Sequence, residues 1–100
     1  MTLTRYIFHP AANRELLEAF NHYEDRVEGL GYDLLQEVER AIQLLLAHPE
    51  AAPRVTSEVR RYTLNRFPYS LIYRARQDRL RILAIAHQSR RPLYWIGRWG

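Results

Sequence analysis

The sequence predicts the α+β class: an N-terminal strand and an antiparallel two-helix hairpin, followed by an antiparallel sheet of three to four strands. Apolar residues recur at helical spacing through residues 10–48, and after residue 58 the pattern changes to the alternation typical of strands. Helices laid on an antiparallel sheet are the layered arrangement that this order allows. With 100 residues, of which 47% are hydrophobic, the chain can bury one core but not two, so residues 1–100 are expected to form a single domain.

The first strand is expected over Leu3–Phe8, a short β-prone segment. The helix that follows opens at His9-Pro10, because proline is tolerated in a first turn, and Gly29 and Gly31 supply the backbone freedom to end it. Its buried face is predicted from the spacing of Leu16, Phe20, Tyr23 and Val27.

A second helix follows at once and ends at His48-Pro49. Two helices joined by a short connection are antiparallel neighbours. Most acidic residues of the chain lie on them, and on amphipathic helices we expect a solvated face rather than paired catalytic carboxylates. The predicted buried stripe of this helix consists of Leu34, Val38, Ala41 or Ile42, and Leu45.

Three strands are predicted after a proline-containing loop over residues 50–58. The turn-prone residues 65–68 and the short connection 77–79 make them a meander. Side chains of a strand alternate between its two faces, so one face is expected to pack on the helices. The predicted strands are Val59–Leu64, Tyr69–Arg76 and Leu80–His87.

Charge is divided between the two halves of the chain. Residues 1–50 hold four arginines and nine acids, whereas residues 51–100 hold eleven arginines and two acids, so the net charges are −5 and +9. All fifteen cations are arginine. A concentrated cationic surface attracts anionic partners, so we expect an acidic partner.

Several kinds of site are not expected. Cysteine is absent, and the four histidines lack the spacing of a metal site, so the sequence predicts no metal and no cofactor. No glycine-rich phosphate loop is present. No apolar run approaches the roughly 18 residues of a membrane span, and the N-terminus does not resemble a secretion signal, so we expect a cytoplasmic protein.

The second half interleaves arginines with aromatic residues from Arg60 to Arg98. This composition suits nucleic acid, whose phosphates meet guanidinium groups and whose bases stack on rings, and it equally suits an acidic amphipathic peptide. His87 and Ser89 have the residue types of a base and a nucleophile, but no carboxylate is placed to orient them. The residue chemistry leaves the choice between partners open.

Larger motifs carry a resemblance. Arg60-Arg61-Tyr62 precedes Phe67-Pro68-Tyr69-Ser70-Leu71-Ile72-Tyr73, and the chain ends with Ala86-His87-Gln88-Ser89-Arg90-Arg91-Pro92-Leu93-Tyr94-Trp95. Together with the two helices, this order resembles the RelE/ParE superfamily of bacterial toxins, and its ParE branch in particular. The resemblance implies the toxin of a type II toxin–antitoxin system. RelE-like members cut messenger RNA in the ribosome, whereas ParE-like members inhibit DNA gyrase.

The resemblance also implies which branch applies. Where RelE-like enzymes carry an arginine and two alternating basic residues, this chain has Ser70, Arg61 and Thr63, and their later arginine falls at Gln88 or Ser89. RNA cleavage needs proton-transfer groups and cations at the phosphate. We therefore expect a ParE-like gyrase inhibitor that is not an enzyme. The alternative is an mRNA endonuclease with a reduced site of Arg61, His87, Arg90 and Tyr94.

The expected partners are DNA gyrase as the target and an acidic antitoxin, of the ribbon-helix-helix type, in a hetero-oligomer with the toxin. The antitoxin segment is expected along the helix hairpin and the sheet edge. A simple nucleic-acid-binding module ranks last, because no helix-turn-helix signature is present, so sequence-specific binding of nucleic acid is not expected. The residues predicted to bind the antitoxin or target are Arg61, Arg66, Arg90, Arg91, Tyr94, Trp95 and Arg98.

Overall fold

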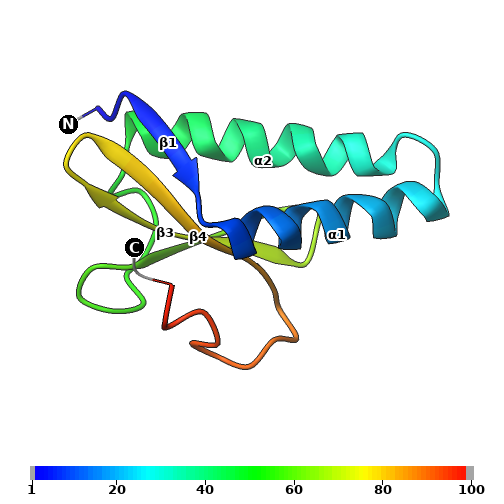
Figure 1. Ribbon diagram of the computed structural model, residues 1–100. Helices are drawn as coiled ribbons and strands as arrows, with labels where there is room; N and C mark the ends of the chain where they lie inside the picture. The colour runs from blue at the N-terminus through cyan, green and yellow to red at the C-terminus, as the bar shows by residue number, and fades with distance from the viewer. Residues whose placement is uncertain (1, 99–100) are drawn as a thin grey trace.

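A computed structural model describes residues 2–98 of the chain. Helices α1 and α2 lie side by side over one face of a sheet, and the segment after the last strand lies beneath the opposite face (Figure 1). The elements in chain order are β1 (Arg5–Phe8), α1 (Pro10–Arg26), α2 (Leu30–Ala47), β2 (Arg60–Thr63), β3 (Tyr69–Arg76) and β4 (Arg79–His87).

The α+β class, the N-terminal strand and the helix hairpin are confirmed, but the sheet is mixed rather than fully antiparallel. Its order is β1-β4-β3-β2, and β1 pairs in parallel with β4. The helix hairpin returns the chain to the end where β1 begins, since the N–H of Leu3 donates to the carbonyl of Leu46 at 2.8 Å. β2 therefore runs in the direction of β1, and after two reversals β4 does so as well.

The strand boundaries follow the alternation closely. β3 spans the predicted residues, and β4 begins one residue early, at Arg79. β2 is one residue shorter at each end than the predicted range. β1 begins at Arg5 rather than at Leu3. The backbone N–H of Leu3 donates to Leu46 of α2 instead of to β4, and the Leu3 side chain is buried.

The turn between the helices is held by close packing. A side chain on Gly31 would meet the ring and the carbonyl oxygen of Phe20 at 2.7 Å, so only glycine fits there. Gly29 has a φ of 90°, in the left-handed region that favours glycine. The Glu24 carboxylate accepts the N–H groups of both glycines at 2.9 Å, so this acid caps the turn.

The buried stripe predicted for α2 is confirmed, since every member of it is buried. The prediction for α1 was less accurate. Leu16 and Tyr23 of its predicted stripe are partly buried against the core, but its fully buried residues are Ala12 and Ala19, and Val27 is mostly exposed. Val27 is the C-cap residue and has an extended backbone, so helical spacing does not predict the direction of its side chain.

Both faces of the sheet are covered. Leu71, Tyr73 and Ile85 pack toward the helices, whereas Ile72 and Trp95 belong to a second cluster on the other face. A β-bulge occurs where the β3–β4 register shifts between Ile72 and Tyr73. As a result, the consecutive residues Leu83 and Ala84 of β4 both belong to the second cluster. The second cluster consists of Val59, Ile72, Leu83, Ala84 and Trp95.

Candidate functional site

A groove of about 310 Å³ lies on the face of the sheet away from the helices. Strands β2, β3 and β4 form its floor, and the segment after β4, residues 88–95, forms its wall. Its basic side chains are those of Arg61, Arg90 and Arg91. Its apolar lining includes Val55, Ile72, Ala86 and Leu93.

Five of the seven residues predicted to bind a partner line this groove. They are Arg61, Arg90, Arg91, Tyr94 and Trp95. Trp95 is only 3% exposed and packs against Ile72 and Leu83, so it supports the wall from within the second cluster. Arg90 lies over the ring of Tyr94, with 3.9 Å from its guanidinium carbon to the ring centroid. This contact holds one cation of the groove in place.

Arg66 and Arg98 lie elsewhere. The Arg66 guanidinium is 3.5 Å from the carboxylate of Asp33 on α2, and both side chains are exposed. Exposed ion pairs of this kind contribute little to stability. Arg98 turns inward, toward α1, and its side chain is 18% exposed.

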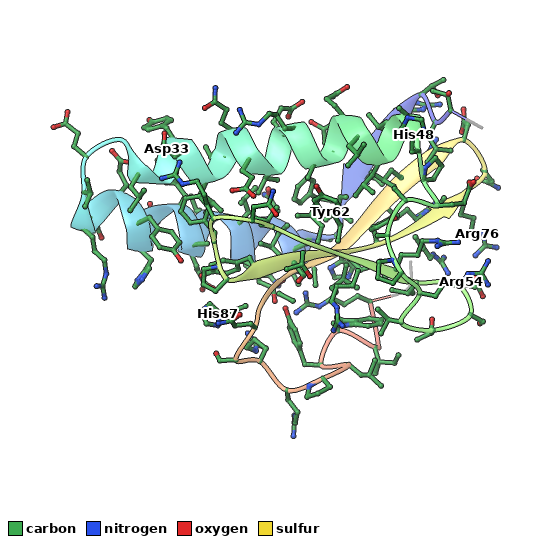
Figure 2. The ribbon with its side chains drawn as sticks, turned by 180° about the vertical axis from the view of Figure 1, so that it is seen from behind. Asp33, His48, Arg54, Tyr62, Arg76 and His87 are labelled. Atoms are coloured by element: carbon green, nitrogen blue, oxygen red, sulfur yellow. The ribbon has the colours of Figure 1, made fainter. Side chains whose placement is uncertain are left out.

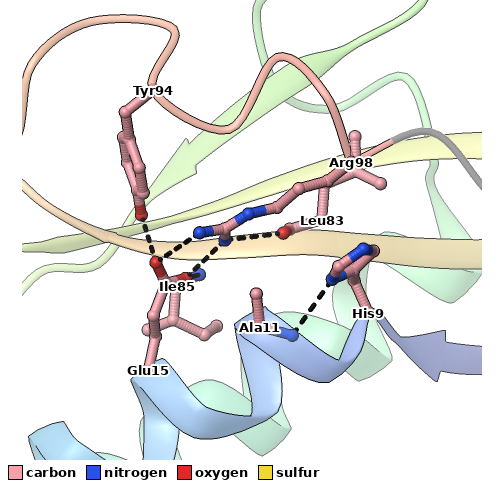
Figure 3. A network of polar contacts seen from close by, with 7 residues as sticks. All are labelled: His9, Ala11, Glu15, Leu83, Ile85, Tyr94 and Arg98. Atoms are coloured by element: carbon pink, nitrogen blue, oxygen red, sulfur yellow. Dashed lines mark hydrogen bonds and ion pairs between the residues drawn. The ribbon is translucent and has the colours of Figure 1, made fainter.

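A partly buried polar network accounts for Arg98 (Figure 3). Its two terminal nitrogens donate to the two carboxylate oxygens of Glu15, at 2.9 and 3.0 Å, and Nη1 also donates to the carbonyl of Leu83 at 3.1 Å. The Tyr94 hydroxyl donates to the same carboxylate at 2.9 Å. The guanidinium of Arg98 is therefore paired within the chain.

Glu15 and Arg98 also complete the edge of β4. The parallel pairing with β1 ends at Phe8 and Ile82. Beyond it, the Ile85 N–H donates to Glu15 at 3.0 Å, and the Leu83 carbonyl accepts from Arg98. The two side chains thus satisfy backbone groups that would otherwise need a neighbouring strand.

Sequence reasoning missed Glu15, which belongs to none of the motifs that the sequence analysis considered. A signal was present in the spacing. Ala12 and Ala19, the two buried residues of α1, lie three residues before and four after Glu15, which puts all three on one helical stripe. An acid on the buried stripe of a helix is almost always paired or hydrogen-bonded.

The network changes the acid–base properties of its members. Burial, together with the hydrogen bond to Glu15, raises the pKa of Tyr94 well above its ordinary value. Hydrogen bonds to Glu15 raise the pKa of Arg98, against the opposing effect of burial. The Tyr94 phenol therefore keeps its proton to a higher pH than an ordinary tyrosine does.

His87 and Ser89 do meet, as their types suggested. The Ser89 N–H donates to His87 Nδ1 at 3.0 Å, and the Ser89 hydroxyl lies 2.8 Å from the same nitrogen. Since a backbone N–H can only donate, Nδ1 is the acceptor in this contact. Within residues 2–98, no carboxylate is hydrogen-bonded to the ring, so the pair forms a local turn.

The residues of the alternative nuclease site also gather here. Arg61, His87, Arg90 and Tyr94 all line the groove. The hydroxyl of Tyr94, however, is bonded to Glu15. Across the described residues, no three histidine or acidic side chains are arranged to hold a metal ion. Neither described helix is long and apolar enough to cross a bilayer.

Comparisons with known proteins agree with this fold. Residues 6–92 match the family described as ParE toxin of type II toxin-antitoxin system, parDE. Among solved structures, a chain described as "Chromosomal ParDE TA system from P. aeruginosa" aligns with a TM-score of 0.70 and 21% identity, covering 86% of this chain and 96% of that one. At this identity the likeness shows a shared fold. No curated protein matches the chain.

Proposed function

The chain belongs to the ParE toxin family of type II toxin–antitoxin systems, and from this premise we propose that it inhibits DNA gyrase in the cytoplasm through protein contacts alone. In this proposal an acidic antitoxin of the ribbon-helix-helix type neutralises it. The alternative is cleavage of messenger RNA in the ribosome by the residues gathered in the groove.

The observation that carries the proposal concerns proton transfer. Cleavage through a 2′-hydroxyl needs one group that takes a proton and another that gives one. His87 Nδ1 already accepts the Ser89 N–H, and the Tyr94 hydroxyl already donates to Glu15. One ring nitrogen of His87 and the hydroxyl proton of Tyr94 are therefore engaged by bonds within the chain, which supports action by binding.

Two further positions support the same proposal. The resemblance to RelE-like enzymes would place basic residues at Thr63 and Ser70. These two hydroxyls face each other across β2 and β3 and lie 3.1 Å apart. Neither side chain carries a charge, so the groove lacks two cations that would stabilise a crowded phosphate.

The groove suits an acidic, partly apolar antitoxin segment, on the face of the sheet opposite to the helix hairpin along which the sequence predicted that segment. Arg61, Arg90 and Arg91 offer planar donors that match carboxylates, and charge-assisted hydrogen bonds of this kind are the strong ones. Ile72 and Leu93 supply apolar contact beside them. We propose that these three arginines anchor the antitoxin, while Trp95 and Arg98 hold the wall that carries two of them.

Supercoiling by purified gyrase, with and without the purified chain, tests the target. We expect inhibition that the cognate antitoxin reverses. Cleavage of messenger RNA in programmed ribosomes is measured in parallel with the same preparation. RNA cleavage without inhibition of supercoiling, lost on His87→Ala or Tyr94→Phe, would reverse the order of the two functions.

Titration calorimetry with the antitoxin tests the groove. Arg91→Ala should weaken binding by about 1–3 kcal/mol, because a guanidinium that pairs with a carboxylate is lost. Arg66→Ala is the matched control, since Arg66 is also an exposed arginine but lies outside the groove. Equal effects of both substitutions would contradict this site.

A further inference from the structure

A second group of arginines lies on the sheet, at the hairpin end of β3 and β4. None of them belongs to the predicted binding residues. Figure 2 shows Arg76 at this end of the sheet and His87 at the other. The members of this group, the arginine face, are Arg5, Arg74, Arg76, Arg79 and Arg81.

The register of the strands puts these side chains on one surface. Arg79 is the partner of Arg5 in β1 and of Arg76 in β3, and Arg74 is the partner of Arg81. Directly paired residues point to the same side of a sheet, as do residues two apart in one strand. The arginine face therefore spans three adjacent strands, on the side away from the helices.

Among the residues that the structure describes, the acidic side chains near this face are those of Glu58 and Asp78. Glu58 lies 3.4 Å from the guanidinium of Arg74, which is buried. Asp78, in the hairpin turn, accepts a hydrogen bond from the Thr4 hydroxyl at 3.4 Å. Arg5 and Arg76 are exposed, and Arg79 is half-buried. Like charges that face each other across strands destabilise a sheet, and a bound polyanion reverses that effect.

We propose that the arginine face binds the phosphate backbone of double-stranded DNA, without reading its sequence. Duplex DNA carries about one negative charge per 1.7 Å of its axis. Several adjacent guanidinium groups can therefore contact phosphates at the same time. Arginine also pairs with phosphate through two parallel hydrogen bonds.

The surroundings of this face distinguish duplex DNA from an acidic protein segment. Among the described residues, Ile7 is the exposed apolar side chain on this surface of β1, and the arginine face itself contains no ring. A peptide would need an apolar floor, which the groove offers and this face does not. Single strands bind chiefly through stacking on aromatic rings. Backbone binding of a duplex needs only charge.

The proposal goes beyond gyrase inhibition and can fail independently of it. The test is fluorescence anisotropy of the purified chain with a labelled 20-base-pair duplex, in the absence of gyrase, over a range of salt concentrations. The test variant is the triple substitution Arg5→Gln, Arg76→Gln and Arg79→Gln. Loss of three phosphate contacts should reduce the slope of log affinity against log salt by about 2.7. Raising the salt from 50 to 200 mM weakens DNA binding by both proteins. The loss of affinity should be roughly 40-fold smaller for the variant than for the wild type.

A matched control removes the same net charge from the helices. The substitutions Arg14→Gln, Arg26→Gln and Arg40→Gln change exposed residues outside the arginine face and should leave the slope unchanged. Thermal unfolding of both variants verifies that each is folded. The Arg→Lys triple at residues 5, 76 and 79 keeps the charge and should retain the slope, which separates lost contacts from altered folding.

Three results would overturn the proposal. One is an unchanged slope in the glutamine variant of the arginine face. Another is an equal reduction in the helix control, since binding would then follow net charge alone. The third is a glutamate-rich peptide that binds as tightly as the duplex and is equally sensitive to the three substitutions, because the face would then be a protein-docking surface.

Discussion

Glu15 and Arg98 lie 83 residues apart in the sequence and form a two-point ion pair, with Oε1–Nη1 at 2.9 Å and Oε2–Nη2 at 3.0 Å. A bidentate pair fixes orientation as well as distance. One end of the segment that carries Arg90 and Arg91 leaves β4, and the pair holds its other end to α1. The position of the groove arginines therefore depends on a carboxylate that lies outside the groove.

Glu15→Gln tests this dependence. The substitution leaves the Arg98 guanidinium without its counter-charge in a site that is 12–18% exposed. Removing one partner of a fully buried pair costs about 3–5 kcal/mol, so we expect roughly 2–3 kcal/mol here from urea unfolding. Glu18→Gln, an exposed acid on the same helix, should change the unfolding free energy by less than about 0.5 kcal/mol. Similar losses for both would contradict the assigned role.

Tyr94→Phe should reveal a dependence on high pH. The folded-state pKa of Tyr94 is raised above the unfolded value near 10, so its stabilising contribution is fully present below that pH and is lost as the pH rises further. The advantage of the wild type over the variant should stay constant from pH 7 to 9. It should then shrink by up to about 1.4 kcal/mol per pH unit above 10. Urea unfolding at each pH measures it, and a constant difference up to pH 11 would refute the prediction.

Gly31→Ala should loosen the helix hairpin. The added Cβ would lie 2.7 Å from the carbonyl oxygen of Phe20, which belongs to a helix backbone and cannot move cheaply. Overpacking of this kind costs about 1–3 kcal/mol. Gly97→Ala is the control, because nothing lies within 4 Å of its Cβ position. Thermal unfolding compares the two, and an unaffected Gly31→Ala variant would show that the helices can separate freely.

Trp95→Ala should strongly destabilise the fold rather than merely weaken a contact. Its side chain is 3% exposed in the second cluster, and truncation of a buried aromatic residue costs about 3–5 kcal/mol. Trp95→Phe keeps much of the packing and should cost less. Denaturant titration distinguishes this role from direct binding. A Trp95→Ala variant of unchanged stability that only loses antitoxin affinity would instead indicate that Trp95 contacts the antitoxin directly.

The local elements could be predicted because their signals are local. The α2 stripe from Leu34 to Leu45 and the alternation over Tyr69–Arg76 reflect the periods of a helix and a strand, which any single core-facing element must obey. The same reasoning failed for Val27, where the helix had already ended. It also could not pair β1, because parallel pairing with β4 joins residues more than 70 positions apart.

Identical residue types received opposite roles from the fold. Arg91 lies exposed at the groove, whereas Arg98 is paired inside with Glu15, although both stand in one cationic stretch of sequence. Charge alone does not distinguish them, since the partner of Arg98 comes from the other end of the chain.

By itself, the sequence determined the class of fold, the helices and strands, the division of charge and the family resemblance, because each depends on neighbouring residues or on composition. Only the tertiary structure decided that the sheet is mixed, that its second face is covered by Trp95, and that Glu15 holds the wall of the groove. The arginine face is likewise a product of strand register. These features arise from contacts between segments that are distant in the sequence. Whether a side chain is buried or paired there depends on which segments the fold brings together.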